Sequence, residues 1–172
     1  AAARIAELAR EAGDELLRAT AAQMLVPYMR PQMLQPAREL LKDPDPEVRI
    51  AALAMIEPAD PVNRVLAAGP LLADPVRGVR IEAARVLAQR MISEGGDTPE
   101  KRIAWAFRQV TNREATDHEL SILNSGNARY LNRYRSEPEE AQKLTHIGEA
   151  PRTEGNPAEL AAYTVTANVI LN

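Results

Sequence analysis

Apolar residues recur at intervals of three and four along most of the chain, and prolines and short polar turns interrupt them. This interval is the period of an α-helix with one buried face. In the helix that follows Asp14, we expect Leu16, Leu17, Met24 and Leu25 to lie on the buried side. The whole pattern predicts helices over 1–12, 15–28, 31–41, 46–57, 61–72, 76–91, 99–111, 116–135, 138–144 and 158–171.

One short pattern occurs three times in the first half, at a constant interval of 31 residues. The copies contain Arg18, Arg49 and Arg80, and each arginine directly follows an aliphatic residue. A fixed period of this length is typical of stacked repeats, in which each repeat is one small unit of helices. We therefore expect pairs of helices stacked along this half. The same interval separates further apolar positions, namely Leu25, Ile56 and Leu87.

Turn residues punctuate the pattern. The segment 43–46 reads Asp-Pro-Asp-Pro, and its aspartates can cap the helix that follows. The segment 74–75 repeats the Asp-Pro turn one interval later. The segment 125–127, Ser-Gly-Asn, is a predicted weak point within a long helix, because glycine there favours a break.

A domain boundary is predicted at Gly95 and Gly96. The 31-residue phase stops here, and Asp97 follows as a candidate helix N-cap. The sequence thus predicts helical repeats over 1–96 and a smaller helical module over 97–172. The fold class that we expect is all-α, a short α-solenoid followed by a small bundle.

The composition of the chain excludes several classes of site and function. The chain has no cysteine, which excludes disulfides, thiolate metal sites and covalent haem attachment within it. The net charge of −3 does not suit a nucleic-acid binder, which usually carries a basic surface. No apolar run reaches the roughly 20 residues that span a bilayer, so we expect no membrane insertion. The start lacks both a methionine and a signal-peptide pattern, so we expect a piece of a longer protein.

No residue pattern points to a catalytic, metal or cofactor site, and none is predicted. His118 and His146 are far apart, and the neighbours of His118 point in different directions on a helix. No phosphate-binding loop, zinc motif or nucleophile elbow occurs. A pair of carboxylates brought together by the fold would still permit a hydrolase, so an enzyme is disfavoured and left open.

One stretch combines basic and aromatic residues. Arg129 and Arg133 are one helical turn apart, as are Tyr130 and Tyr134. Such a stretch can contact nucleic acid, an anion or a protein partner. The alternative, which we favour, is that the tyrosines pack inward and the arginines are solvated beside them.

The first half resembles the HEAT-repeat family over residues 14–92. The resemblance lies in Leu-x-Asp-Pro followed by Val-Arg-Ile-x-Ala, which occurs twice, whereas the first copy lacks the Asp-Pro turn. It implies a HEAT-like solenoid, in which turn aspartates and helix arginines of successive repeats form a ladder. The ladder residues would be Asp43, Arg49, Asp74 and Arg80. The arginines lie inside the apolar pattern and not opposite it, which favours a structural role over a basic, ligand-facing stripe.

The last 75 residues resemble a C-terminal domain of unknown function from large secreted, cytochrome-associated proteins of planctomycetes. The resemblance lies in residues 108–119 and in the ending, Gly-Glu-Ala-Pro at 148–151 with Glu-Leu-Ala-Ala-Tyr-Thr and Leu-Asn after it. It implies export from the cytoplasm to the periplasm or the exterior, and no established activity. Ala115 stands where that family tends to have proline.

These observations favour a non-catalytic scaffold or protein-interaction module within a larger exported protein or complex. Because both resembled families occur near cytochrome-bearing proteins, a multihaem complex is the expected setting, although this segment holds no haem site. A protein partner is expected, and no cofactor. The alternatives are the C-terminal fragment of a secreted enzyme and, disfavoured by charge, a nucleic-acid-binding HEAT protein.

Overall fold

The computed structural model describes residues 2–30, 34–57, 59–145 and 155–170. Within these ranges all regular secondary structure is helical, with α-helices, two short 3₁₀ helices and no strand. The all-α prediction is confirmed. The elements are α1 (Ala2–Glu11), α2 (Glu15–Leu25), η1 (Val26–Tyr28), α3 (Leu34–Leu40), α4 (Pro46–Met55), α5 (Pro61–Ala68), η3 (Gly69–Ala73), α6 (Arg77–Glu94), α7 (Pro99–Thr111), α8 (Asp117–Ser136), α9 (Pro138–Thr145) and α10 (Pro157–Ile170).

The chain divides into two compact units, Ala1–Glu82 and Ala83–Asn172, which we call unit 1 and unit 2. The division falls inside α6, so one continuous helix belongs to both units. The sequence-based boundary lies further along, at 96/97, where the glycine pair ends α6. The boundary between the compact units and the glycine pair that ends α6 therefore lie at different positions in the chain.

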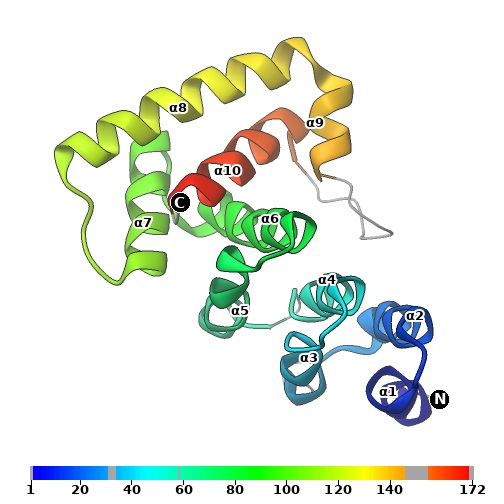
Figure 1. Ribbon diagram of the computed structural model, residues 1–172. Coiled ribbons are helices and arrows are strands. Elements are labelled where there is room, and N and C mark those ends of the chain that lie inside the picture. The colour runs from blue at the N-terminus through cyan, green and yellow to red at the C-terminus, as the bar shows by residue number, and fades with distance from the viewer. Residues whose placement is uncertain (1, 31–33, 58, 146–154, 171–172) are drawn as a thin grey trace. The chain divides into compact units, whose positions relative to one another are not determined.

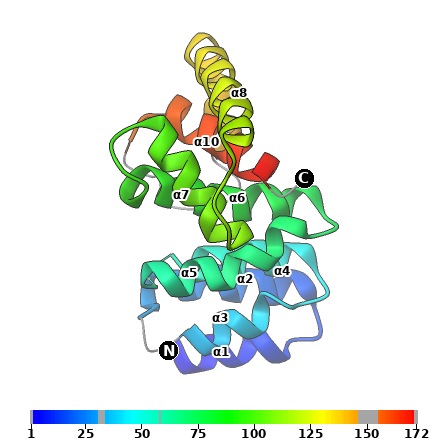
Figure 2. The same cartoon turned by 90° about the vertical axis from the view of Figure 1, so that its left-hand side faces the viewer.

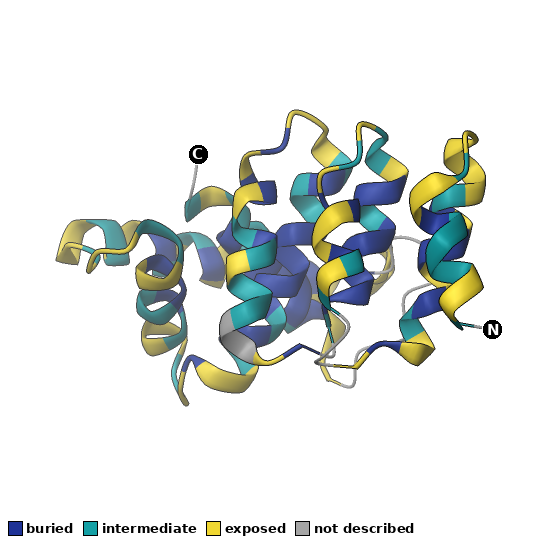
Figure 3. Cartoon of the chain, turned by 90° about the horizontal axis from the view of Figure 1, so that it is seen from below, coloured by how far each residue is buried: buried dark blue, intermediate teal, exposed yellow. Residues whose placement is uncertain are grey.

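Unit 1 consists of helix pairs. Helix α1 contacts α2, and α3 contacts α4, while α1 also contacts α3 and α2 also contacts α4 (Figure 1). The pair α1–α2 thus lies against the pair α3–α4. Buried and exposed bands alternate along these helices (Figure 3), as their amphipathic pattern requires.

The second helices of unit 1 begin at capped turns. The carboxylate of Asp14 accepts a hydrogen bond from the Leu17 amide at 3.0 Å, and Asp45 caps α4 by accepting from the amides of Glu47 and Val48. These side chains satisfy amides at the helix start that have no partner within the helix. Of the aspartates of segment 43–46, which were predicted to cap α4, Asp45 does so, whereas Asp43 accepts from the Asp45 amide within the turn.

Two predicted helices end early because of proline. The helix predicted over 15–28 changes at Leu25 into η1, which contains Pro27, and the helix predicted over 61–72 ends at Ala68, before Pro70 in η3. Proline lacks an amide hydrogen and its ring clashes with the preceding turn, so the α-helical hydrogen bonds stop there.

Unit 2 contains the end of α6 and helices α7 to α10. Helix α10 contacts α8, α9 and α7, and it lies along α8 in both views (Figure 1 and Figure 2). Tyr134 on α8 is buried among alanines of α9 and α10, with further side chains half-buried around them. The alanines are Ala141, Ala158, Ala161 and Ala162.

Helix α8 continues through the predicted weak point at 125–127. Asn127 is buried there, and its side-chain oxygen accepts a hydrogen bond of 3.1 Å from the hydroxyl of Thr166 on α10. A buried polar group is stable when it is paired, so this contact offsets the low helix propensity of the segment.

Candidate interaction surfaces and the arginine–aspartate ladder

Arg49 joins two successive turns of unit 1. Its Nε and Nη2 donate to the carboxylate of Asp74 at 2.9 and 3.0 Å, and its Nη1 donates to the carbonyl oxygens of Asp43 and Pro44. Asp74 also accepts from the Val76 amide at 2.8 Å. The pair is bidentate, buried and fully hydrogen-bonded, which is the geometry in which an ion pair withstands burial.

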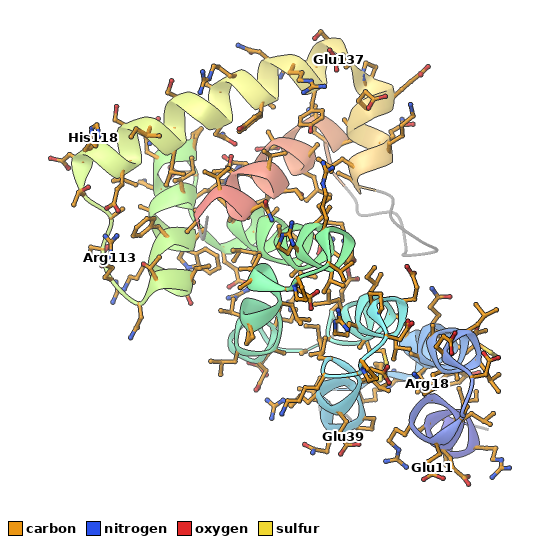
Figure 4. All side chains as sticks on the ribbon, in the orientation of Figure 1. Glu11, Arg18, Glu39, Arg113, His118 and Glu137 are labelled. Atoms are coloured by element: carbon orange, nitrogen blue, oxygen red, sulfur yellow. The ribbon has the colours of Figure 1, made fainter. Side chains whose placement is uncertain are left out.

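Arg18 repeats this arrangement one interval earlier. Its Nε and Nη2 donate to Asp43 at 3.1 Å each, and its Nη1 donates to the carbonyl oxygen of Ala12 at 3.0 Å (Figure 4). The hydrogen bond to Asp43 raises the pKa of Arg18 above its ordinary value. The 31-residue interval placed Arg18 at the position equivalent to Arg49, but no partner was predicted for it, because its own turn lacks Asp-Pro. That interval was the sequence feature from which the Arg18–Asp43 pair could have been predicted.

Arg80 differs from Arg18 and Arg49 in its hydrogen-bond partners. Its Nη1 donates to the carbonyl oxygens of Asp74 and Pro75, at 2.7 and 3.0 Å, as the other two arginines do with their own turns. The position 31 residues after Asp74 is Trp105, so no carboxylate stands in phase for Arg80. The four expected ladder residues thus form one arginine–carboxylate pair, Arg49–Asp74, and two sets of arginine–carbonyl contacts.

The basic, aromatic stretch on α8 divides by side chain. Tyr134 is buried and Tyr130 is half-buried against the same core, whereas Arg129 and Arg133 are exposed. Arg133 donates to Glu137 at 3.1 Å, which raises the pKa of Arg133. The tyrosines therefore stabilise unit 2, and the exposed part of this candidate partner surface is reduced to its arginines.

A tight polar cluster begins α8. Arg113 donates to both carboxylate oxygens of Glu119, at 2.9 and 2.6 Å, while the Thr116 amide donates to Glu119 and the Glu119 amide donates back to the Thr116 hydroxyl. This is a capping box. The hydrogen bonds from Arg113 and then from Thr116 lower the pKa of Glu119 to about 2. His118 lies exposed beside it (Figure 4), and His146 lies outside the described residues.

The outward face of α2 is apolar, contrary to expectation. Of the residues predicted to be buried there, only Leu25 is buried. Leu16 is 73% exposed, Leu17 46% and Met24 55%, and Tyr28 in η1 is 48% exposed. The prediction was wrong because helical spacing shows which residues share a face but not whether another helix covers that face. We call Leu17, Thr20, Met24 and Tyr28 the α2 row.

Among the described residues, no group of three or more histidine, aspartate or glutamate side chains is placed to hold a metal ion. Within the same part of the chain, no helix combines the length and apolar character needed to cross a membrane.

The chain was compared with known proteins. No family model matches it, and no curated protein or solved structure matches it either.

Proposed function

We propose that the chain is a non-catalytic scaffold, a short HEAT-like solenoid with a helical C-terminal module, that binds another protein. The observation that supports this proposal is the exposure of the large apolar side chains of the α2 row. Large apolar side chains that lie together on a surface typically mark a site of contact with another macromolecule. Arg18 pairs with Asp43 and Arg49 with Asp74, so these four charged groups stabilise the stack and are not available to hold a partner.

The resemblance of the C-terminal part extends the proposal to an exported, larger protein or complex. The partner would then be a protein of the same compartment, and a cytochrome-bearing complex is the setting that the resemblance favours. This setting is separate from the role of the α2 row, and either can hold without the other.

Site-specific cross-linking tests the proposed function. Because the chain has no cysteine, a thiol introduced by Met24→Cys can carry a photo-crosslinker at one known position. We expect a discrete protein adduct in an extract of the source organism, identified by mass spectrometry and then reproduced with the purified partner. The adduct should disappear when Leu17→Glu is added. Matched probes at Leu66→Cys on α5 and Ile122→Cys on α8, which are also exposed, should not give this adduct. Equal labelling from all three positions would contradict the proposal.

A further inference from the structure

The α2 row has counterparts one repeat interval along the chain. The residues 31 positions after Leu17, Met24 and Tyr28 are Val48, Met55 and Ala59, and the counterpart of Thr20 is Ala51. Val48 and Met55 are 0% exposed and Ala59 is 3% exposed, whereas the matching residues of the α2 row are about half exposed. Equivalent positions of two repeats therefore differ almost completely in burial.

The cause lies in what covers each helix. Helix α4 has its own first helix, α3, and α2 has its own first helix, α1. Helices α2 and α4 also contact each other, but α4 has a following neighbour as well, since a Cβ on Gly78 of α6 would lie 3.5 Å from the Cδ1 of Ile50. Val48 and Met55 lie on the side of α4 opposite to Ile50, so the preceding pair covers them. Among the described residues, no helix pair occupies the matching position on α2.

The residue types of the α2 row are those of a stacking position. Leu17 stands where Val48 stands in the next repeat, and Met24 stands where Met55 stands. A terminal repeat of a solenoid usually carries a polar outer face, because nothing stacks on it. Helix α1 follows that rule, with Arg4, Arg10 and Glu11 exposed. The α2 row does not, so its composition is that of a covered face.

The ladder is incomplete at the same place. Ala12 stands where Asp43 and Asp74 stand in the later repeats. An arginine of a helix pair seated on α2 would meet Ala12 at the position where the later turns offer a carboxylate, and the carboxylate of Asp14 in this turn caps α2 instead. Docking on α2 would then depend on apolar contact, without the bidentate ion pair that joins the repeats of unit 1.

We infer that the α2 row is the docking face for a further helical repeat of the same kind, seated on α2 as α2 is seated on α4. This inference rests on the proposed function and names the class of partner. The occupant is an alanine-rich helix pair. Three of the four buried residues of α2 are alanines, so the face that a repeat offers to its neighbour is small and accepts large side chains. Two α2 rows from two copies of this chain would instead oppose large side chains to large ones.

The test adds one repeat to the full chain. Residues 2–32 are duplicated ahead of residue 2, which keeps the 31-residue phase. A single thiol is placed at the original Met24 by Met24→Cys, and its rate of reaction with a maleimide is compared in the normal and extended chains. We expect the extended chain to react at least about tenfold more slowly, because labelling then requires local opening. The control, Leu66→Cys, should react equally in both chains. Equal rates at position 24 would overturn the inference.

A second measurement tests the geometry of docking. In the extended chain, Ala12→Asp at the original turn supplies the missing carboxylate for the arginine of the added repeat. We expect this substitution to raise the melting temperature of the extended chain and to leave that of the normal chain unchanged. If the thiol is protected but Ala12→Asp has no effect, the added repeat is not stacked as α2 is on α4, and the inference fails.

A third measurement separates a second copy from a repeat. The reaction rate of Met24→Cys in the normal chain should not depend on protein concentration, and light scattering should give the mass of a monomer. Slower labelling together with a dimer mass at high concentration would show that a second copy is the occupant and overturn the inference. None of these results decides whether a cross-linked partner exists in the source organism, so the two proposals can fail separately.

Discussion

Both units of this chain contain arginine–carboxylate pairs, but the pairs differ in burial and in reach. In unit 1 the side chains of Arg49 and Asp74 are 10% and 6% exposed and lie 25 residues apart in sequence. In unit 2 those of Arg113 and Glu119 are 54% and 32% exposed and only six residues apart. Arg133 and Glu137, also exposed, are four apart.

The difference shows that arginine–carboxylate pairs have two structural roles in this chain. A buried bidentate pair between distant turns fixes one repeat against the next, and either partner left alone is strongly unfavourable. An exposed pair within one turn closes a local structure, and solvent screens most of its energy. Unit 2 does have a long-range pair, between Arg102 and Glu159 at 2.6 Å, but it does not recur at an interval as the ladder does.

The largest effect should come from breaking the buried pair. Arg49→Leu leaves the carboxylate of Asp74 buried without its guanidinium, and two carbonyl oxygens lose a donor. We expect the free energy of unfolding to fall by about 3–5 kcal/mol, measured by urea denaturation. The matched substitution in unit 2, Arg133→Leu, should change it little because that pair is exposed.

Arg49→Lys sharpens this comparison, because lysine keeps the charge but not the planar fork. Its stability should lie between those of the parent and Arg49→Leu. Similar losses for Arg49→Leu and Arg133→Leu would show that burial does not separate the two kinds of pair.

The second prediction compares a glycine from each unit. A Cβ at Gly95, where α6 ends, would lie 2.6 Å from the Met91 carbonyl oxygen and 2.8 Å from the Cα of Arg102. Gly95→Ala should therefore cost about 1–3 kcal/mol of unfolding free energy, since backbone must move. At Gly13, before α2, a Cβ meets nothing within 4 Å, and Gly13→Ala should raise stability by up to about 1 kcal/mol. Thermal unfolding of both variants decides this, and a harmless Gly95→Ala would mean that the glycine serves only as a flexible joint.

The smallest expected effect is the loss of stability of the α8 start at acid pH. The pKa of Glu119 is about 2 in the folded chain, below the ordinary value of 4.5, so its contribution to stability is complete above pH 4.5 and is lost as the pH falls toward 2. The first turn of α8 should fray over this range, seen as loss of the Glu119 amide hydrogen bond to Thr116 by NMR. Glu119→Gln should remove that pH dependence. A titration midpoint near 4.5 for Glu119 would contradict the prediction.

Much of the architecture followed from the sequence because it depends on local chemistry. The 31-residue phase located the arginines, and the helix predicted from 116 begins at the capping box of Thr116 and Glu119. Asp97 was the expected N-cap of α7, but Thr98 caps that helix by accepting from the Lys101 amide, and the side chain of Asp97 pairs with Lys101. The breaks at Pro27 and Pro70 were missed because the apolar pattern continued past each proline, and the pattern was given more weight than the backbone. Helix α8 runs through Gly126 because a distant residue, Thr166, supports it.

The exposure of the α2 row could not be predicted, for a different reason. Leu17 and Val48 occupy the same position of the same pattern, and Met24 and Met55 are the same residue type. Their burial differs because of which helices lie beside them. A repeated sequence specifies the shape of each unit equally well, but its neighbours determine which of its apolar faces stays in water.

The two arginine–aspartate pairs of unit 1 span equal lengths of chain, from Arg18 to Asp43 and from Arg49 to Asp74, 25 residues each. Surface connections between helices usually tolerate insertions and deletions during evolution. Here the connections lie inside a fixed span, and one residue gained or lost would carry the aspartate away from its arginine. Descendants of this sequence should therefore vary in the residues of these connections while keeping their length, and should change length by whole repeats.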